Sequence, residues 1–278
     1  MLYLRGPGQR AVSGRACRGW GAGWREVGEA RGPVAVPAGN QVKLRARSLG
    51  WADAGPLDSL GPRDLQALTL GETASEPVLA SLGHLTGLEL LDLWAAPVGD
   101  EAMGYVARLP GLKVLDLWGT RVSDAGLRAL AQLEGLRRLT VPGRQTGDAV
   151  MPCLADLGGL RELNLSGSSV TDAGLALLTK AHSLVRLSLW ETRVTDAGLR
   201  HLHHLHSLEE LDLGATAVTD QALAHLRRLP LRWVSLQDTL VSPEGLRGLR
   251  SALPGCRIEP ADVDGCRAWR PPAPGRPA

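Results

Sequence analysis

Leucine recurs along the chain at a nearly constant spacing. Successive intervals of 24 residues separate six leucines, and intervals of 23 residues add one more at each end of the series: Leu65, Leu88, Leu112, Leu136, Leu160, Leu184, Leu208 and Leu231. When each of these leucines is counted as position 1 of a unit, apolar residues return at positions 4, 6, 11, 16, 19 and 22. A fixed period of this length indicates a stack of structural units, each burying its apolar face against its neighbours.

Each unit predicts a strand, a turn and a helix. In the Leu112 unit, Leu115 and Leu117 flank a polar residue, which is the period of a half-buried strand. Positions 16, 19 and 22 are spaced for one face of a helix. Position 12 is Ser or Thr in five units and is the expected N-cap, followed by Asp or Pro at position 13. Glycine at position 15, as in Gly126, predicts close approach of this helix to the strand layer.

The repeat resembles the leucine-rich repeat family. The family core L-x-x-L-x-L-x-x-N/C-x-L is matched by Leu112, Leu115, Leu117 and Val122, and seven or eight units match over roughly 64–258. Position 9 departs from the family pattern, because five units have Thr where Asn or Cys is usual; a Thr hydroxyl makes fewer of the backbone bonds that Asn makes. The V-T-D-A-G-L motif of residues 194–199 is similar to ribonuclease-inhibitor-like and F-box-associated repeats, whose outer side is a true helix.

This resemblance implies an α/β fold, a right-handed solenoid or horseshoe with a parallel β-sheet on its concave face and α-helices on its convex face. The chain is then divided into a disordered Gly/Arg-rich leader (1–40), an N-terminal cap or degenerate repeat (41–63), the repeat domain (64–260) and a Pro-rich tail (261–278). A cap is expected because a solenoid must cover the open face of its first unit, and Trp51 is the expected cover. No apolar run predicts a signal peptide or a transmembrane helix.

Charge is distributed unevenly along the chain. Of the net charge of +2, residues 1–47 contribute +7 and residues 255–278 contribute +1, so the repeat body carries about −6. An acidic body argues against a nucleic-acid-binding surface, which requires a basic stripe. A basic leader can touch an anionic membrane or nucleic acid, but an unstructured leader or an overextended start of the reading frame is the preferred interpretation. We therefore expect neither a nucleic-acid partner nor a membrane partner.

The four cysteines have no metal-ligand spacing and no disulfide pattern. Cys17, Cys153, Cys256 and Cys266 contain no C-x-x-C pair, which disfavours a structural zinc site. Reducing cytoplasm is the expected location. A bridge between Cys256 and Cys266 is left open.

The chain's candidate site is the exposed face of the predicted sheet, because positions 4 and 6 point into the core while positions 3, 5 and 7 point away from it. Position 7 places three tryptophans in one column, and Trp233 at position 3 adds a fourth to the surface. Neighbouring strands are about 4.8 Å apart, so Trp94 is expected to stack on Trp118. The expected partner-binding residues are Asp92, Trp94, Asp116, Trp118, Arg138, Arg186, Trp190, Asp212 and Trp233.

Two interpretations of this surface are open. In the first, the aromatic and acidic residues accept a partner segment that carries Arg or Lys, since Trp is enriched at binding hot spots. In the second, the tryptophans pack on each other and on neighbouring turns, and the Asp column is merely solvated. The irregular Leu136 unit, with Pro142 and Arg144, is either a specificity feature or drift; Pro142 is expected to interrupt or end its strand.

Histidines on one outer helix suggest a second kind of site. His201 and His204 are one helical turn apart, which can suit a metal, but no carboxylate or cysteine completes a ligand set, so a solvated helix face is preferred. The chain has no G-x-S-x-G, no P-loop and no H-E-x-x-H motif, and an open sheet lacks an enclosed pocket. We therefore expect a non-enzyme without a cofactor.

The sequence thus predicts a monomeric, cytoplasmic protein–protein interaction scaffold that binds another protein on its concave face. The alternative is a substrate-recognition subunit or effector acting with a ubiquitin ligase, because F-box proteins carry similar repeats. The segment before Leu65 shows no convincing F-box helices.

Overall fold

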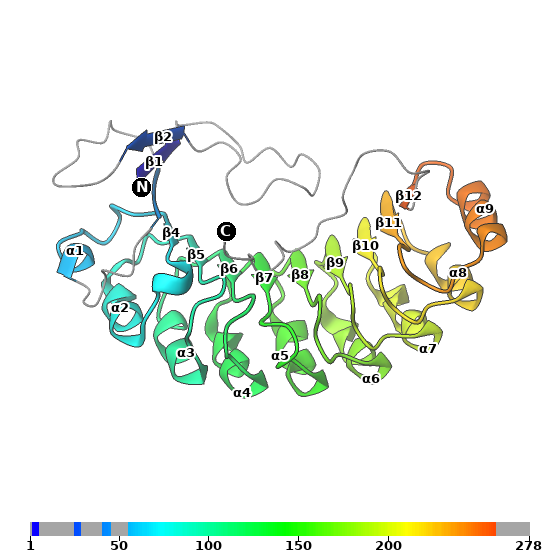
Figure 1. Cartoon of the computed structure of the whole chain (residues 1–278), viewed down its shortest axis with the longest axis horizontal. Coiled ribbons are helices and arrows are strands. Elements are labelled where there is room, and N and C mark those ends of the chain that lie inside the picture. The colour runs from blue at the N-terminus through cyan, green and yellow to red at the C-terminus, as the bar shows by residue number, and fades with distance from the viewer. Residues whose placement is uncertain (1, 6–24, 29–40, 46–54, 260–278) are drawn as a thin grey trace, which may run out of the picture.

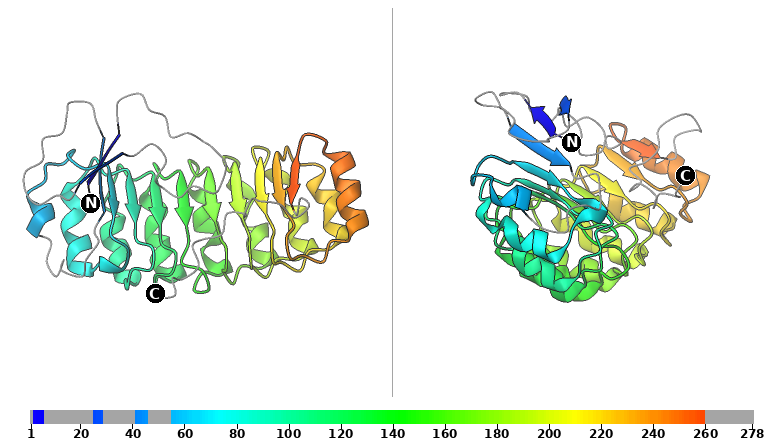
Figure 2. Two further views of the ribbon diagram at one scale, coloured as in Figure 1. Left: turned by 45° about the horizontal axis from the view of Figure 1, so that its top comes forward. Right: turned by 60° about the vertical axis from the view of Figure 1, so that its left-hand side comes forward.

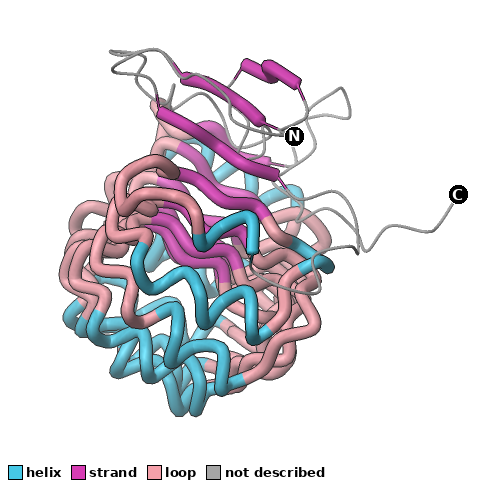
Figure 3. The backbone as a smooth tube through the Cα atoms, turned by 90° about the vertical axis from the view of Figure 1, so that its left-hand side faces the viewer, coloured by secondary structure: helices cyan, strands magenta, loops and turns pink. Residues whose placement is uncertain are grey.

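The molecule is a curved stack of repeating units. A computed structural model describes residues 2–5, 25–28, 41–45 and 55–259. Strands line the inner side of the curve and helices line the outer side, as Figure 1 shows from the side and Figure 2 from two further directions. Seen from the N-terminal end in Figure 3, the strands form one layer and the helices another, joined by loops. The predicted α/β solenoid, with its sheet concave and its helices convex, is confirmed.

One sheet of twelve strands runs through the molecule, in the order β12-β11-β10-β9-β8-β7-β6-β5-β4-β3-β1-β2. The parallel strands are β3 (Gln41–Arg45), β4 (Ala67–Thr69), β5 (Leu90–Asp92), β6 (Val114–Asp116), β7 (Arg138–Thr140), β8 (Glu162–Asn164), β9 (Arg186–Ser188), β10 (Glu210–Asp212), β11 (Trp233–Ser235) and β12 (Arg257–Glu259). From β4 to β12, positions 3, 4 and 5 of each unit pair with the same positions of the next unit. Pro142 does not shorten β7, because position 7 lies beyond the strand end.

The N-terminal edge of the sheet is antiparallel. β1 (Leu2–Arg5) pairs with β3 on one side and with β2 (Arg25–Gly28) on the other. These two segments are strands, whereas the sequence pattern predicts no structure within residues 1–40. The expected cap strand at Val42 is present as β3, and a short helix, α1 (Gly55–Asp58), follows it. Trp51 lies outside the described residues.

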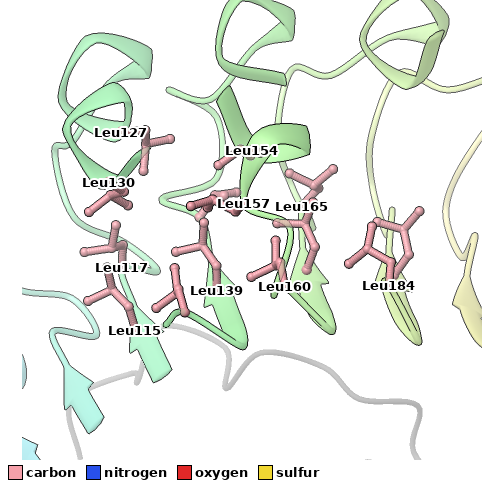
Figure 4. Close-up of a cluster of buried hydrophobic side chains, with 14 of the residues drawn as sticks. Leu115, Leu117, Leu127, Leu130, Leu139, Leu154, Leu157, Leu160, Leu165 and Leu184 are labelled. Carbon is pink, nitrogen blue, oxygen red and sulfur yellow. The ribbon is translucent and has the colours of Figure 1, made fainter. Parts of the chain in front are cut away.

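The core lies between the sheet and the outer helices. Figure 4 shows Leu115 and Leu117 from a strand facing Leu127 and Leu130 from the outer helix of the same unit, and neighbouring units repeat this arrangement. All four side chains are fully buried. Their burial follows from the sequence pattern, because alternate strand positions and every third or fourth helix position point to the same layer.

The outer helices are shorter than the sequence pattern predicts. The α-helices after α1 are α2 (Glu76–Ser81), α3 (Asp100–Val106), α4 (Asp124–Leu127), α5 (Met151–Asp156), α6 (Asp172–Ala176), α7 (Asp196–Leu199), α8 (Leu223–Leu226) and α9 (Pro243–Ala252). Several are preceded or extended by 3-10 turns: η2 (Leu82–His84), η3 (Arg128–Gln132), η4 (Asp148–Val150), η5 (Leu178–Lys180), η6 (Arg200–His204) and η7 (Asp220–Ala222). A further 3-10 turn, η1 (Gly71–Thr73), lies in the turn after β4. A 3-10 helix rises further per residue than an α-helix, so it spans the outer side with fewer residues.

Hydrogen bonds between units join the helix starts into a ladder. Thr195 is the N-cap of α7, and its hydroxyl accepts a bond from the Ala197 N–H, as predicted. The same hydroxyl donates to Asp172 Oδ2 (2.7 Å), and the Thr195 N–H donates to Asp172 Oδ1 (2.8 Å). Both atoms are thus held by the position 13 carboxylate of the preceding unit. Equivalent pairs are Asp100 with Ser123, Asp148 with Thr171, Asp196 with Thr219 and Asp220 with Ser242.

This ladder explains the glycine at position 15, for which the sequence predicts close approach to the strand layer. The neighbour is instead the Asp of the preceding unit: a Cβ at Gly198 would collide with Oδ1 of Asp172, and Gly126, Gly174 and Gly245 are in the same situation. Glycine is retained because it leaves room for this carboxylate.

Helix type follows the residue at position 15. Val150 and Ala222 carry a Cβ beside an Asp of the preceding unit, and their helices begin with the 3-10 turns η4 and η7. Ala102 also carries a Cβ, but the preceding unit has Pro77 in place of the Asp, and α3 begins as an α-helix. The 3-10 starts therefore coincide with a Cβ at position 15 in units whose preceding unit carries the Asp.

Thr at position 9 closes the turn after the strand in the five units that carry it. The Thr120 hydroxyl donates to the Leu117 carbonyl (2.8 Å), and Thr192, Thr216 and Thr239 make the same bond in their units. Thr therefore makes part of the backbone bonding expected of the family's Asn at this position, in line with its smaller hydrogen-bonding capacity.

We expect Ser123→Ala to reduce the free energy of unfolding by about 1 kcal/mol, the usual effect of losing an N-cap. The bonds from Ser123 also lower the pKa of Asp100, so in the variant this pKa should move back towards its ordinary value. Denaturant unfolding and an NMR titration of the Asp100 carboxyl measure the two effects. Ser123→Thr is the matched control and should preserve both, because Thr occupies this position in other units. An unchanged Asp100 titration in Ser123→Ala would contradict the ladder.

Candidate partner-binding surface

Three columns of side chains form the concave face of the sheet. They come from positions 3, 5 and 7, because positions 4 and 6 are buried in the leucine core. All nine residues predicted to bind a partner lie on these columns. Arg138, Arg186 and Trp233 are at position 3, Asp92, Asp116 and Asp212 at position 5, and Trp94, Trp118 and Trp190 at position 7.

The aspartates at position 5 bond to the backbone of their own units. Oδ1 of Asp92 accepts the Trp94 N–H, Oδ1 of Asp116 accepts the Trp118 N–H and Oδ1 of Asp212 accepts the Gly214 N–H, each at 3.0 Å. This is the Asx turn that short polar side chains make two residues onward. These carboxylates therefore shape the turn after the strand, and they are less available to a partner than exposed aspartates.

Burial changes the ionisation of the position 5 carboxylates. Asp212 is 2% exposed, and burial raises its pKa to about 6 although the Gly214 N–H opposes the rise. Burial also raises the pKa of Asp92, against the opposing effects of the Trp94 N–H and the nearby Lys43 charge. Lys43 is itself buried, and this burial lowers its pKa. The concave face is therefore poorly solvated at these positions.

Trp118 and Trp190 lie against neighbouring turns, and Trp94 does not stack on Trp118. No ring contact joins Trp94 to Trp118 in the part of the chain that the structure describes, so the predicted stacking is wrong. A Cβ at Gly167 would lie 3.1 Å from Cη2 of Trp118, and one at Gly143 would lie 3.8 Å from its Cζ3. The Trp118 ring therefore extends over the glycine turns of the next two units, and it would crowd a Cβ at Gly167 but make only an ordinary contact with one at Gly143.

The Trp190 ring likewise lies over a glycine of the next unit, because a Cβ at Gly214 would collide with it. Trp94 differs: its indole N–H is buried and has no hydrogen-bond acceptor among the described residues. The rings are half-buried, so part of each remains on the concave surface. The structure thus combines the two interpretations, since the rings pack on neighbouring turns while exposing part of their surface.

Position 3 changes character along the sheet. In β5 and β6 it carries Leu90 and Val114, which are half-buried apolar side chains four positions before Trp94 and Trp118. From β7 to β10 it carries the alternating charges of Arg138, Glu162, Arg186 and Glu210, and in β11 it carries Trp233. The position 3 column is therefore apolar in β5 and β6 and charged from β7 to β10.

The charged side chains at position 3 of β7 to β10 pair with one another. Glu162 forms ion pairs with Arg138 on one side and Arg186 on the other, and Arg186 Nη1 also lies 3.8 Å from Glu210 Oε1. Burial lowers the pKa of both arginines, which stay cationic at neutral pH. Arg138 and Arg186 are thus held by glutamates that the sequence analysis missed. The signal was present, because Arg and Glu alternate at position 3 at 24-residue spacing.

The histidines and cysteines among the described residues form neither a metal-ligand cluster nor a disulfide. Nowhere in the described ranges do three or more His, Cys, Asp or Glu side chains converge so that they could hold a metal ion. Cys153 and Cys256 are free thiols, and burial raises the pKa of Cys256 to about 11. Cys17 and Cys266 lie outside the described residues. No helix in the described part has the length and apolar character needed to span a membrane.

Comparisons with known proteins agree with this architecture. A family model described as a leucine-rich repeat matches residues 160–178. The structure is similar to that of internalin C2 from Listeria monocytogenes str. 4b F2365, with 23% sequence identity and a TM-score of 0.50, over 68% of this chain and 78% of that chain. No protein with a curated function is similar to this chain in sequence. The fold is a leucine-rich-repeat solenoid.

Proposed function

We propose that this chain is an interaction scaffold that binds another protein on the concave face of its sheet. Leucine-rich-repeat folds typically serve as protein-interaction scaffolds. The observation that carries the proposal is the apolar and aromatic surface formed by Leu90, Trp94, Val114 and Trp118, which stays partly exposed on the inner side of an open sheet. Exposed apolar surface with a polar border is typical of protein-binding sites.

The partner segment is expected to bring apolar side chains to this surface. A partner segment that binds mainly through Arg or Lys is less favoured than an apolar one, because Asp116 and Asp212 are buried and bonded to the backbone. Arg138 and Arg186 are already paired with glutamates, so they set the polar border of the surface. Trp190 and Trp233 extend the surface towards its C-terminal end.

We place the scaffold in a reducing compartment such as the cytoplasm, since Cys153 and Cys256 are free thiols. Action with a ubiquitin ligase has no specific support in the described residues or in the comparisons. Binding to another protein is therefore the function that we propose.

A sharp test uses substitutions that the fold already accepts. Leu90→Arg combined with Val114→Glu extends the native Arg–Glu alternation of position 3 into β5 and β6, because Val114 pairs with Arg138 in the next strand. The expected result is loss of partner binding by at least about tenfold, because charged groups would be desolvated against the partner's apolar side chains. The free energy of unfolding should fall by only about 1–2 kcal/mol, because both side chains are half-buried and lie outside the leucine core. Affinity capture with quantitative mass spectrometry, beside denaturant unfolding, measures both.

Leu177→Glu is the matched control, because Leu177 is an apolar side chain on the convex side with 43% exposure. Proteins retained by the wild type and by Leu177→Glu, and lost from the double variant, would support the proposal. If all three forms retain the same proteins in the same amounts, the concave face is not the binding surface.

A further inference from the structure

A pocket of about 350 Å³ lies on the convex side, between the outer helices of two consecutive units. It is lined by Arg200, His201, His203, His225 and Arg228. The first three belong to η6, which follows α7, and the others lie in or next to α8; α7 and α8 are neighbours on the outer side in Figure 1. This side is opposite the concave surface, so the pocket is separate from the proposed partner-binding site.

The repeat period brings these residues together. Leu199 and Leu202 are buried in the core, which leaves Arg200, His201 and His203 on the outward side of their helix. The next unit stacks directly against this one and contributes His225 and Arg228 from the same outer side. Two arginines and three histidines therefore meet in a hollow whose described lining contains no acidic side chain.

Among the described residues, no carboxylate neutralises the cationic groups of this pocket. No ion pair joins Arg200 or Arg228 to an acidic side chain within the described ranges. Arg200 Nε lies 3.2 Å from Nε2 of His201, to which it donates a hydrogen bond. The carboxylate whose charge acts on His201 is Asp172, and both of its oxygens already accept bonds from Thr195. On the concave face, by contrast, Arg138 and Arg186 are both paired with Glu162.

A metal ion does not fit this arrangement. Two guanidinium groups in the lining repel a cation, and the pocket residues do not form a metal-ligand cluster in the described part of the chain. The side chains present are instead those that bind oxyanions: Arg offers planar pairs of N–H donors, and His adds donors when it is protonated. The pocket volume is at the small end of the range for ligand sites, so the bound group must be small.

We propose that this pocket binds a small phosphate-bearing anion, with Arg200 and Arg228 as the charged clamps and His201, His203 and His225 as additional donors. A phosphate group carries a charge of about −1.5 to −2 near neutral pH and three strong acceptor oxygens. A bound phosphate would supply the negative charge that the described lining of the pocket lacks.

Binding and protonation should be coupled. Burial lowers the pKa of His201, and the charges of Arg200 and His203 lower it further. A bound anion opposes those charges and favours the protonated ring, so affinity should increase as pH falls. Three charged or titratable groups from its own helix face His201: Arg200, His203 and His204. The next unit contributes His225 and Arg228, and α6 contributes Asp172. The His182 ring contacts the backbone of His204.

The test is calorimetric titration with inorganic phosphate and with sulfate, using the full chain. Sulfate stays a dianion throughout the pH range, so any pH dependence of its affinity reports protonation of the protein. We expect wild-type sulfate affinity to rise at least about threefold from pH 8 to pH 6, since His titrates in this range. Arg200→Gln/Arg228→Gln should weaken phosphate binding at least about tenfold, because charge-assisted hydrogen bonds are lost.

Arg128→Gln is the matched control. Arg128 occupies in the Leu112 unit the position that Arg200 occupies in the Leu184 unit, but it does not line the pocket. Circular dichroism checks that all variants are folded. Phosphate binding by the wild type and by Arg128→Gln, lost in the double variant, supports the proposal. It is overturned by absence of phosphate binding, by equal loss in Arg128→Gln, or by binding only to anionic phosphatidylserine vesicles and not to free phosphate.

Discussion

Replacing Asp212 by asparagine is expected to stabilise the protein by up to about 3 kcal/mol at pH 8. Asp212 is 2% exposed, and its pKa in the folded state is about 6, whereas an aspartate in an unfolded chain titrates near 4. Each unit of difference corresponds to about 1.4 kcal/mol. An asparagine keeps the oxygen that accepts the Gly214 N–H but carries no charge. Asn164 shows that the fold accepts this residue, because its Oδ1 accepts the Ser166 N–H at the equivalent position.

The sign of the pH dependence follows from the direction of the shift. The folded state holds the Asp212 proton more tightly than the unfolded state, so its contribution to stability is fully present below pH 4 and is lost as pH rises through about 6. The difference between Asp212→Asn and the wild type should therefore be small at pH 4, grow up to about pH 6 and then stay constant. Urea unfolding at several pH values measures it. Glu101→Gln, an exposed carboxylate on α3, controls for net charge. A pH-independent difference would show that Asp212 is not protonated preferentially in the folded state.

Replacing Gly198 by alanine is expected to destabilise the protein by about 1–3 kcal/mol, the usual range for an overpacked site. The added Cβ would collide with Oδ1 of Asp172, which would have to release Thr195 or force the start of α7 towards a 3-10 turn. The same substitution at Gly104 should have the opposite sign. Gly104 lies in α3 with open space around its Cβ direction, and Ala is favoured over Gly in a helix by about 0.5–1 kcal/mol.

A double-mutant cycle with Asp172→Ala identifies the cause. Without the Asp172 carboxylate, Gly198→Ala should lose its cost and become neutral or stabilising, which corresponds to a coupling energy of about 1–3 kcal/mol. Thermal and denaturant unfolding of the four proteins provide the measurement. Additive effects of the two substitutions would mean that Gly198 is retained for a reason other than room for this carboxylate.

The periodic pattern was sufficient to predict the units of this solenoid. Apolar spacing predicted the strand and helix of each unit, because one face of each element must be buried and the two elements have different periods. N-cap residues such as Thr195 and Ser242 were recognisable from local rules, since a cap bonds to the backbone two or three residues away. The same reasoning placed all nine candidate binding residues on the concave columns.

Contacts between units were decided only by the tertiary structure. A single unit does not show that Asp172 reaches the next N-cap, that Trp118 extends over Gly167, or that Glu162 joins two arginines. The sequence therefore determined what each unit is and which residues lie on each of its faces, through backbone geometry and the burial of leucine. Stacking determined what those residues touch, because side-chain direction and hydrogen-bond pairing depend on the neighbouring unit as well as on the residue itself.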